Sequence, residues 1–302
     1  MEEVKCNLCG KDDYIKIFDG KDYLHGFSGS FNVVKCRCCG LIYLNPRPSP
    51  SEMETYYPDH YVSFDKQHSM AVKKIAQAVT KMKTINLQRI VGAGEKRVLE
   101  IGCSDGAFLA ALRDLTSWNL KGVEPNKRIS EKARKKGFDV KTATIEEITL
   151  PVNNFDLVIM NHVIEHVTDP DFALRKIYSI LKLNGILYME LPNIDCTERW
   201  LFGKYWSGYD VPRHLYSFSA KSLEDIMKKK GFRIKHISYS MDPSSLFLSI
   251  RHVLKYKYGL ERLSNIFTLN NLLLLFPFAF ISFFHKIMKL SGIITVVGKK
   301  ED

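Results

Sequence analysis

Four cysteines near the start of the chain have the residue type and spacing of a metal site. Cys6 and Cys9 form one C-x-x-C pair, Cys36 and Cys39 form a second, and a glycine follows each pair. Two intervening residues let one turn present both sulfurs to a single ion, and thiolates are soft ligands that suit tetrahedral Zn²⁺. We expect a structural zinc ion, because four protein ligands leave no open coordination position.

The other cysteines are assigned differently. Cys38 could replace a ligand, but Cys36 and Cys39 preserve the symmetric spacing. Cys103 and Cys196 are expected to be small packing residues. The alternative for the whole set is scattered reduced cysteines of a cytosolic protein, since the first residues contain no apolar signal segment.

A second pattern, a loop of small residues between a strand and a helix, has the chemistry of a nucleotide site. Residues 100–106 read Glu-Ile-Gly-Cys-Ser-Asp-Gly, and the small residues at 102, 104 and 106 let the backbone approach a ligand closely. Glu124 ends the following strand, where a carboxylate can accept two hydrogen bonds from ribose hydroxyls. Together they predict an adenosine-containing cofactor.

This loop resembles a known family motif. Glu100-x-Gly102-x-Ser104-x-Gly106 is similar to motif I of the class I S-adenosylmethionine-dependent methyltransferases, with Ser104 in place of the usual middle glycine. Residues 161–167, Asn-His-Val-Ile-Glu-His-Val, resemble the segment that follows the fourth strand in that family and borders the methionine end of the cofactor.

The resemblance covers about residues 95–242 and 292–300 and implies S-adenosylmethionine as the cofactor. The cofactor site that it implies consists of Glu100, Gly102, Cys103, Ser104, Gly106, Glu124, Pro125, Thr144, Ile145, Asn161 and His162. The cysteine pairs, residues 41–48 and Tyr56-Tyr57 resemble the zinc-binding domain that precedes a subset of these enzymes. Some relatives with this layout methylate nucleotide-linked sugars, and others lie among genes for surface glycans or lipids. The implied acceptor is a small molecule, most simply a sugar, glycolipid or lipid-linked glycan precursor.

An acceptor with a hydroxyl group or an acidic carbon needs a group that removes its proton. Residues 199–216, which should follow the fifth strand, are aromatic, basic and glycine-containing. Loops at this end of a sheet often carry catalytic groups. His214 is the first candidate for a general base, because its ordinary pKa lies near neutrality. Arg213 could hold a phosphate or carboxylate of the acceptor with two hydrogen bonds. In the alternative interpretation this segment only packs the loop, with Arg213 paired to a carboxylate.

The elements that must position these residues alternate between strands and helices. A doubly wound, mainly parallel α/β sheet binds ligands at the carboxyl ends of its strands. Its predicted strands are residues 97–101, 120–124, 138–142, 155–161, 186–191, 232–240 and 293–298. We expect a zinc-binding domain over 1–48, a linker and helix over 49–94 with the helix at 69–91, and the methyltransferase domain over 95–302.

An apolar insertion separates the last two strands, at residues 243–291. Its uncharged run at 263–284 contains asparagines and Pro277, and the purely apolar part is about a dozen residues. That length favours a buried or interfacial helix, so the segment either caps a pocket or dimer seam or lies in a membrane interface. Basic residues flank it, which favours peripheral association of a cytoplasmic protein with the inner membrane face through 263–290.

The composition and charge constrain the class of partner. The chain has 302 residues, 45% of them hydrophobic, and a formal net charge of +11. Such a surplus favours anionic partners, but basic runs such as 132–136 stand at predicted helix ends, where positive charge is locally favourable. An RNA-modifying methyltransferase stays an alternative, although no RNA-module motif is present. A nicotinamide-dependent dehydrogenase would want glycines where Ser104 and Ala107 stand. A non-catalytic cofactor-binding module is the remaining alternative, and the methylated atom and the oligomeric state stay open.

Overall fold

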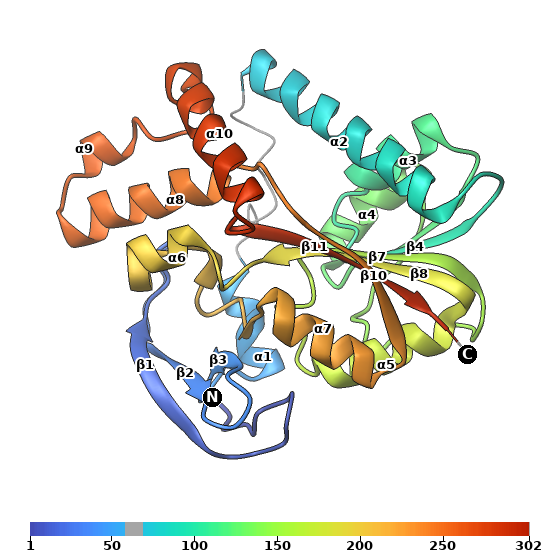
Figure 1. Cartoon of the computed structure of the whole chain (residues 1–302), viewed down its shortest axis with the longest axis horizontal. Coiled ribbons are helices and arrows are strands. Elements are labelled where there is room, and N and C mark those ends of the chain that lie inside the picture. Colours follow the sequence, from blue (N-terminus) through green and yellow to red (C-terminus); the bar gives the residue numbers. More distant parts are fainter. Residues whose placement is uncertain (58–68, 302) are drawn as a thin grey trace. The chain divides into compact units, whose positions relative to one another are not determined.

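The computed structural model describes residues 1–57 and 69–301, which form two compact units (Figure 1). Of these described residues, the cysteine unit comprises 1–57, 191–223 and 237–295, and the sheet unit comprises 69–190, 224–236 and 296–301. Residues 58–68 of the predicted linker lie outside the described residues. The domain boundaries expected after residues 48 and 94 stay predictions.

The seven-stranded sheet confirms the expected α/β fold class. Its strand order is β10-β11-β8-β7-β4-β5-β6, and the β4–β5, β4–β7, β5–β6 and β7–β8 pairs are parallel. The strands are β4 (Arg97–Ile101), β5 (Asn119–Val123), β6 (Asp139–Lys141), β7 (Phe155–Asn161), β8 (Leu181–Pro192), β10 (Phe232–Tyr239) and β11 (Ile293–Lys300).

The central strands of the sheet are buried because they carry apolar residues on both faces. Val98 of β4 and Leu157 of β7 are fully buried in one cluster with Trp118. The helices are α2 (Met70–Val91), α3 (Ala107–Leu115), α4 (Lys127–Lys135), α5 (Pro170–Ile180) and α7 (Ala220–Lys229). These connections bring the ends of β4, β5 and β7 together at one edge, where a ligand site is expected.

Helix α2 lies where the sequence predicts it, but several of its apolar residues are exposed. The Ser69 side chain accepts a hydrogen bond from the Val72 amide and caps the helix. Val72 is buried, whereas Val79 and Met82 are exposed. Leu87 is buried instead.

The entry to β8 differs from the sequence expectation. The sequence predicts a strand over 186–191 after the turn-forming residues Asn184 and Gly185, but the strand begins at Leu181. Phe155 pairs with Leu181 and Leu157 pairs with Ile186, so the register jumps between them. Asn184 has φ of 64° at this irregularity. The two turn-forming residues therefore make a bulge within a strand and do not stop the helix.

The cysteine unit contains a second sheet, in the order β1-β2-β3-β9 with antiparallel pairing. Its strands are β1 (Tyr14–Gly20), β2 (Phe31–Cys36), β3 (Ile42–Leu44) and β9 (Tyr216–Ser217). Short helical turns complete the unit: α1 (Pro50–Met53), η1 (Glu54–Tyr56), α6 (Thr197–Phe202), η2 (Gly203–Tyr205) and η3 (Ser207–Tyr209). The fourth strand comes from the segment that was expected to carry the catalytic base.

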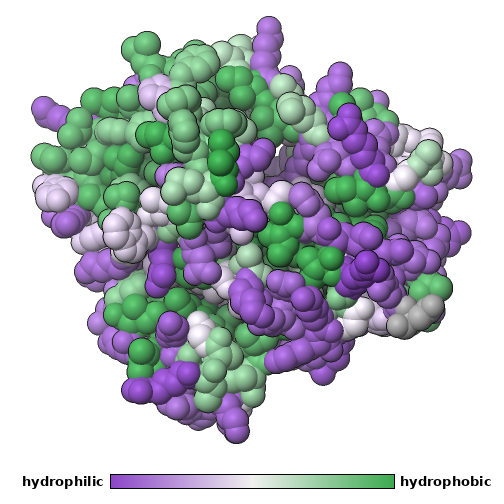
Figure 2. All heavy atoms as spheres, in the orientation of Figure 1, coloured by the Kyte–Doolittle hydropathy of each residue, from purple (hydrophilic) through white to green (hydrophobic). Residues whose placement is uncertain are grey.

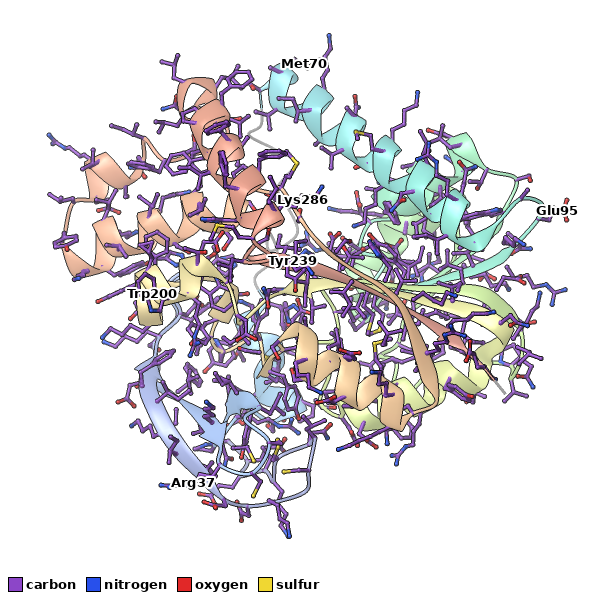
Figure 3. The ribbon with its side chains drawn as sticks, in the orientation of Figure 1. Arg37, Met70, Glu95, Trp200, Tyr239 and Lys286 are labelled. Carbon is purple, nitrogen blue, oxygen red and sulfur yellow. The ribbon has the colours of Figure 1, made fainter. Side chains whose placement is uncertain are left out.

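The apolar insertion between β10 and β11 is helical, as expected. It consists of α8 (Ser244–His252), a π-helical turn η4 (Val253–Lys257), α9 (Glu261–Ser264) and α10 (Leu272–Ile287). Figure 2 shows hydrophobic residues gathered over these helices, and Figure 3 marks Lys286 at the end of α10. Among the described residues, none of the helices combines the length and the hydrophobicity needed to traverse a bilayer.

Candidate functional site

The loop after β4 has a backbone that requires its glycines. Gly102 has φ of 68°, and a Cβ placed there would lie 2.5 Å from the Val163 side chain. Gly106 has φ of 76° and caps the start of α3. Both positions therefore favour glycine for conformation, and Gly102 also lacks space for a side chain.

Ser104 keeps the conformation of the glycine that it replaces. Its φ is 49°, in the left-handed region that costs an L-residue about 1–2 kcal/mol. Its amide donates a 3.0 Å hydrogen bond to Oε2 of Glu124, and the Asn126 amide donates to Oε1 at 2.9 Å. Glu124 is thus held at the tip of β5. Burial raises the pKa of this carboxyl, and the two backbone donors only partly offset that effect.

Glu100, at the tip of β4, is buried and incompletely satisfied. Asn161 at the tip of β7 donates to its Oε1 at 3.3 Å. Burial raises the pKa of Glu100 to about 8. Within the described part of the chain, Glu100 Oε2 and Ser104 Oγ are buried without a hydrogen-bond partner. Because buried polar groups are normally paired, these atoms fit a polar ligand between the strand tips.

Lys83 and Glu190 belong to the same site and were missed by the sequence analysis. The Lys83 ammonium, from α2, donates to Asn161 Oδ1 at 2.9 Å and to Glu190 Oε1 at 2.8 Å. It also lies over the Tyr188 ring at 5.6 Å. Glu190 could have been found as the acid near the end of the fifth strand. Lys83 is one of several lysines on α2, and its spacing in the sequence does not distinguish it from the others.

His162 follows β7 with φ of 55°, an uncommon backbone for a residue with a side chain. Its Nδ1 lies 3.5 Å from Glu165 Oε1 and its Nε2 lies 3.8 Å from Glu190 Oε1. Burial lowers the pKa of His162, but the two carboxylates outweigh it and raise the pKa above its ordinary value. The imidazole is therefore biased toward its charged form.

The other predicted cofactor residues differ in what they can offer. The Cys103 side chain is buried, and its sulfur would lie 2.5 Å from a Cβ on Gly122. Its side chain packs against the sheet, so only its backbone remains for the loop. Ile145 is buried, Thr144 accepts a hydrogen bond from the Glu147 amide in the turn after β6, and Pro125 is exposed beside Glu124.

Arg213 is fully buried and paired with two carboxylates in the cysteine unit. It donates from Nη1 and Nη2 to Asp22 at 2.9 and 2.8 Å, and from Nε and Nη2 to Asp210 at 3.0 and 2.6 Å. Nη1 also donates to the Tyr56 carbonyl. This is the alternative raised from the sequence, an arginine that fixes the loop. With its donors engaged and its surface covered, Arg213 is not placed to grip an acceptor.

His214 lies beside this ion pair and is only slightly exposed. Its Nδ1 is 2.8 Å from the carbonyl oxygen of Gly208, which can only accept, so Nδ1 carries the proton. In the neutral tautomer with this proton, Nε2, which lies 3.9 Å from Asp210 Oδ2, carries the lone pair. A neutral imidazole with an accepting Nε2 is the form that a general base requires.

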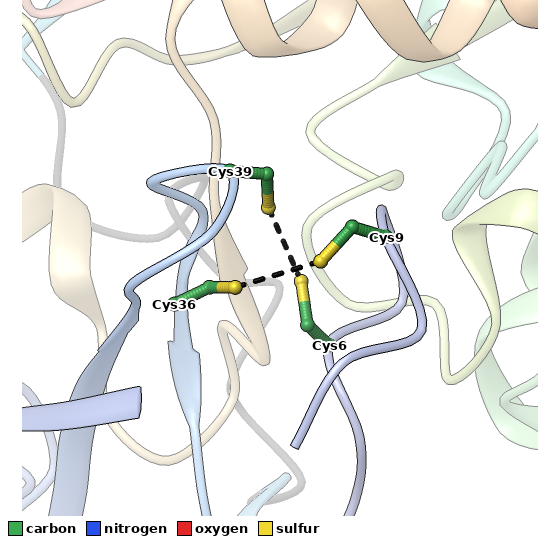
Figure 4. Close-up of side chains that lie close together, drawn as sticks. All are labelled: Cys6, Cys9, Cys36 and Cys39. Atoms are coloured by element: carbon green, nitrogen blue, oxygen red, sulfur yellow. Dashed lines mark hydrogen bonds between the residues drawn. The ribbon is translucent and has the colours of Figure 1, made fainter. Parts of the chain in front are cut away.

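The four cysteines of the two C-x-x-C pairs converge (Figure 4). The Cys6 and Cys39 sulfurs are 3.4 Å apart, the Cys9 and Cys36 sulfurs are 3.5 Å apart, and all four lie within 4.8 Å of one another. The glycine after each pair has positive φ, 73° and 78°. Cys38 is exposed and outside the cluster.

The cluster fits the geometry and chemistry of a zinc site. Zn–S bonds of about 2.3 Å in a tetrahedron give sulfur–sulfur edges of roughly 3.8 Å, close to these separations. Burial raises the pKa of Cys6, and of Cys39 to about 11. Burial also acts on Cys36, but backbone hydrogen bonds outweigh it and lower its pKa to about 7. As metal ligands the four sulfurs would be thiolates, whose negative charge needs a cation such as Zn²⁺.

The fold and strand-tip site define the class of protein as a Rossmann-like methyltransferase. Residues 68–237, more than half of the chain, match the family described as "Methyltransferase domain". The chain belongs to this family and is an S-adenosylmethionine-dependent methyltransferase. The dehydrogenase and non-catalytic alternatives are therefore wrong.

The chain is also similar to curated relatives, and it shares its fold with solved structures. The chain is 26% identical over 177 residues to a ubiquinone biosynthesis O-methyltransferase of Cereibacter sphaeroides, covering 52% of this chain and 71% of that protein. A SAM-dependent methyltransferase of Thermotoga maritima shares the fold at TM-score 0.51 and 21% identity, over 83% of this chain and 96% of that one. Phosphoethanolamine N-methyltransferase 2 of Haemonchus contortus, solved with S-adenosyl-L-methionine, does so at TM-score 0.55 and 17% identity, over 96% and 69%.

Proposed function

We propose that this enzyme transfers the methyl group of S-adenosylmethionine to a hydroxyl of a small acceptor, either a sugar or a lipid-linked molecule. The observation that carries the cofactor part is the pair of incompletely satisfied polar side chains, Glu100 at the tip of β4 and Ser104 in the loop that follows it. Curated relatives named as O-methyltransferases support oxygen as the methylated atom. The resemblance of the cysteine segment to sugar-methylating relatives supports the acceptor class.

In this proposal the tips of different strands bind different parts of the cofactor. Glu124 accepts hydrogen bonds from the ribose hydroxyls, because two backbone amides already orient its carboxylate. Gly102, Gly106 and the backbone of residues 103–104 form the loop that approaches the cofactor closely. Glu100, Asn161 and Lys83 lie at the methionine end, where acceptor and donor groups suit an amino acid moiety. Pro125, Thr144 and Ile145 border the adenine.

The bound cofactor supplies a methyl group on a positively charged sulfur that a nucleophile displaces in line. The protein then has to align the acceptor, an effect that can amount to roughly 7–11 kcal/mol in well-oriented reactions. His214 takes the acceptor proton on Nε2, and the Gly208 carbonyl holds the proton of Nδ1 in place. Arg213 acts as a positioning residue that fixes Asp210 beside this imidazole.

The proposed zinc ion is structural. Cys6, Cys9, Cys36 and Cys39 would bind it, which leaves no position for substrate. It would supply a cross-link between the start of the chain and the turn after β2. A sheet with one strand of only two residues gains from such a staple.

A lipid-linked acceptor would also give the enzyme a reason to associate with a membrane through residues 263–290. The exposed apolar helix α10 supports this part of the proposal. Enzyme and acceptor would then meet on one surface, which raises their local concentration.

Calorimetric titration of S-adenosylmethionine and of NAD tests the cofactor site. We expect saturable binding of the first only, weakened about 10- to 100-fold in Glu124→Gln, since a charge-assisted hydrogen bond is worth about 1.5–3 kcal/mol. Glu131→Gln, on the exposed face of α4, is the matched control. Equal affinities in the two variants would contradict the ribose assignment. Release of S-adenosylhomocysteine with sugar, lipid-linked and RNA acceptors then tests the acceptor class.

A further inference from the structure

Helix α10 has an exposed stripe that is almost wholly apolar. The exposed fractions of Leu273, Phe276 and Phe280 are 87%, 71% and 63%, and Phe284 and Ile287 continue the row toward the C-terminal end. The intervals of three and four residues place these side chains along one face of the helix. The opposite face includes Ser282, which is buried. The helix is therefore apolar on the side where a surface helix is normally polar.

Neighbouring elements of the cysteine unit also expose large apolar side chains. Leu260 precedes α9 and Leu263 belongs to it. Both side chains are exposed, as is that of Ile266. On α6, Trp200 is 83% exposed and Leu201 is exposed beside it (Figure 3). Isolated exposed hydrophobic residues are ordinary, but a gathering of this kind marks an interaction surface. Figure 2 shows such a gathering over α8, α9 and α10.

The charge around this surface is mainly positive. Residues 262–300 contain no aspartate or glutamate. Lys286 and Lys289 are exposed at the C-terminal end of α10, and Lys255 and Lys257 are exposed on η4. Glu261 is the acid of this region, and it is paired with Lys255 at 3.0 Å. The exposed apolar stripe is therefore bordered by positive charge.

We propose that this surface, defined as the exposed residues of α9 and α10 with their flanking lysines, docks in the plane of an anionic lipid bilayer. The inference rests on the proposed function only in that a lipid-linked acceptor gives the docking a purpose. Phenylalanine and leucine enter the acyl boundary, while lysines contact the headgroups. Helix α10 has 16 residues and contains Pro277, which suits an interfacial position.

Charge decides between a bilayer and a second copy of the chain. A symmetric dimer through this face would bring the same lysine-bordered surface against itself, and Glu261, the acid of α9, is already paired with Lys255. Anionic headgroups supply the missing negative charge. The lipid surface is therefore the occupant that satisfies both the apolar stripe and its basic border.

Sedimentation of the full-length enzyme with vesicles tests the docking. Vesicles of phosphatidylcholine alone are compared with vesicles containing phosphatidylglycerol, at about 0.1 M and about 0.5 M salt. We expect binding only to the anionic vesicles. Phe276→Ser with Phe280→Ser should weaken it at least tenfold, and Lys286→Glu with Lys289→Glu should weaken it roughly tenfold or more at low salt.

Matched controls carry the same changes on other surfaces. Met70→Ser with Met82→Ser removes two side chains on α2, each 71% exposed, and Lys132→Glu with Lys135→Glu reverses two exposed charges on α4. The proposal is overturned if these controls weaken vesicle binding as much as the α10 variants do, or if the enzyme ignores anionic vesicles. A dimer that dissociates in the Phe276/Phe280 variant, without vesicle binding, would assign the face to a second copy.

Different results would contradict the membrane docking and the proposed function. Calorimetry of S-adenosylmethionine without vesicles should give the same affinity for the wild type and the α10 variants. If vesicle binding is present but lipid-linked acceptors are not methylated, the docking stands and the acceptor class is wrong. If methylation proceeds equally with and without the Phe276 and Phe280 side chains and no vesicle binding is seen, only the docking is wrong.

Discussion

One pair of buried carboxylates in each unit shows two opposite environments. In the cysteine unit, Asp22 and Asp210 are bound by Arg213. Burial raises the pKa of Asp22, but Arg213 and the His25 amide together outweigh burial and lower it. In the sheet unit, burial raises the pKa of Glu100 and of Glu124 at the strand tips. Carboxylates that are already paired hold a loop in place, whereas incompletely satisfied ones are available to a ligand.

The largest expected effect concerns the metal, which would distinguish the cysteine unit most sharply. Cys6→Ser should lower the zinc content from about one ion per chain to none and unfold the sheet that contains β1–β3, because structural zinc sites contribute their binding energy to folding. Metal analysis and backbone NMR measure this. Cys38→Ser is the control and should keep both. A metal-free Cys6→Ser protein with an intact sheet would contradict the assignment of a structural zinc ion.

The next effect tests whether Arg213 is structural. Arg213→Met leaves two buried carboxylates without their cation, so we expect the free energy of unfolding to fall by about 3–5 kcal/mol. Chemical denaturation measures it. Arg175→Met, which breaks an exposed pair with Asp171, should change stability by less than about 1 kcal/mol. A stable Arg213→Met enzyme with a raised KM for the acceptor would return Arg213 to substrate binding.

A third effect depends on pH and tests the sheet unit. The folded-state pKa of Glu100, about 8, lies above its ordinary value of 4.5, so the folded state keeps a proton that the unfolded state loses. This group's contribution to the free energy of unfolding should therefore fall as pH rises from 4.5 to 8, by up to roughly 1.4 kcal/mol per pH unit. Glu100→Gln should flatten that slope. Parallel pH profiles for wild type and variant would falsify the assignment.

The smallest effect concerns Lys83. Lys83→Met removes the ammonium that holds Asn161 and Glu190, so the Asn161 amide loses part of its orientation toward Glu100. We expect affinity for S-adenosylmethionine to fall by about fivefold, or roughly 1 kcal/mol, with little loss of stability. Lys81→Met, exposed on the same helix, is the matched control. Identical titrations of the two variants would remove Lys83 from the site.

The sequence by itself determined the sheet, its order of elements and the loop that approaches the ligand. These depend on local signals: continuous apolar runs for strands buried on both faces, and glycines where φ is positive. The two C-x-x-C pairs belong to the same category, because each knuckle is a local turn and the two copies share one spacing. Ser104 shows the strength of such signals, since it keeps a glycine conformation at an energetic cost.

Only the tertiary structure decided which polar groups meet. Asp22 and Arg213 are 191 residues apart and Lys83 and Glu190 are 107 apart, and no local pattern links them. The structure likewise decided that Tyr216–Ser217 joins the N-terminal sheet and that one face of α10 stays exposed although both faces are apolar. The physical reason is that pairing of charges and burial of side chains depend on neighbours brought together by the whole fold, whereas turns and strands depend on a few adjacent residues.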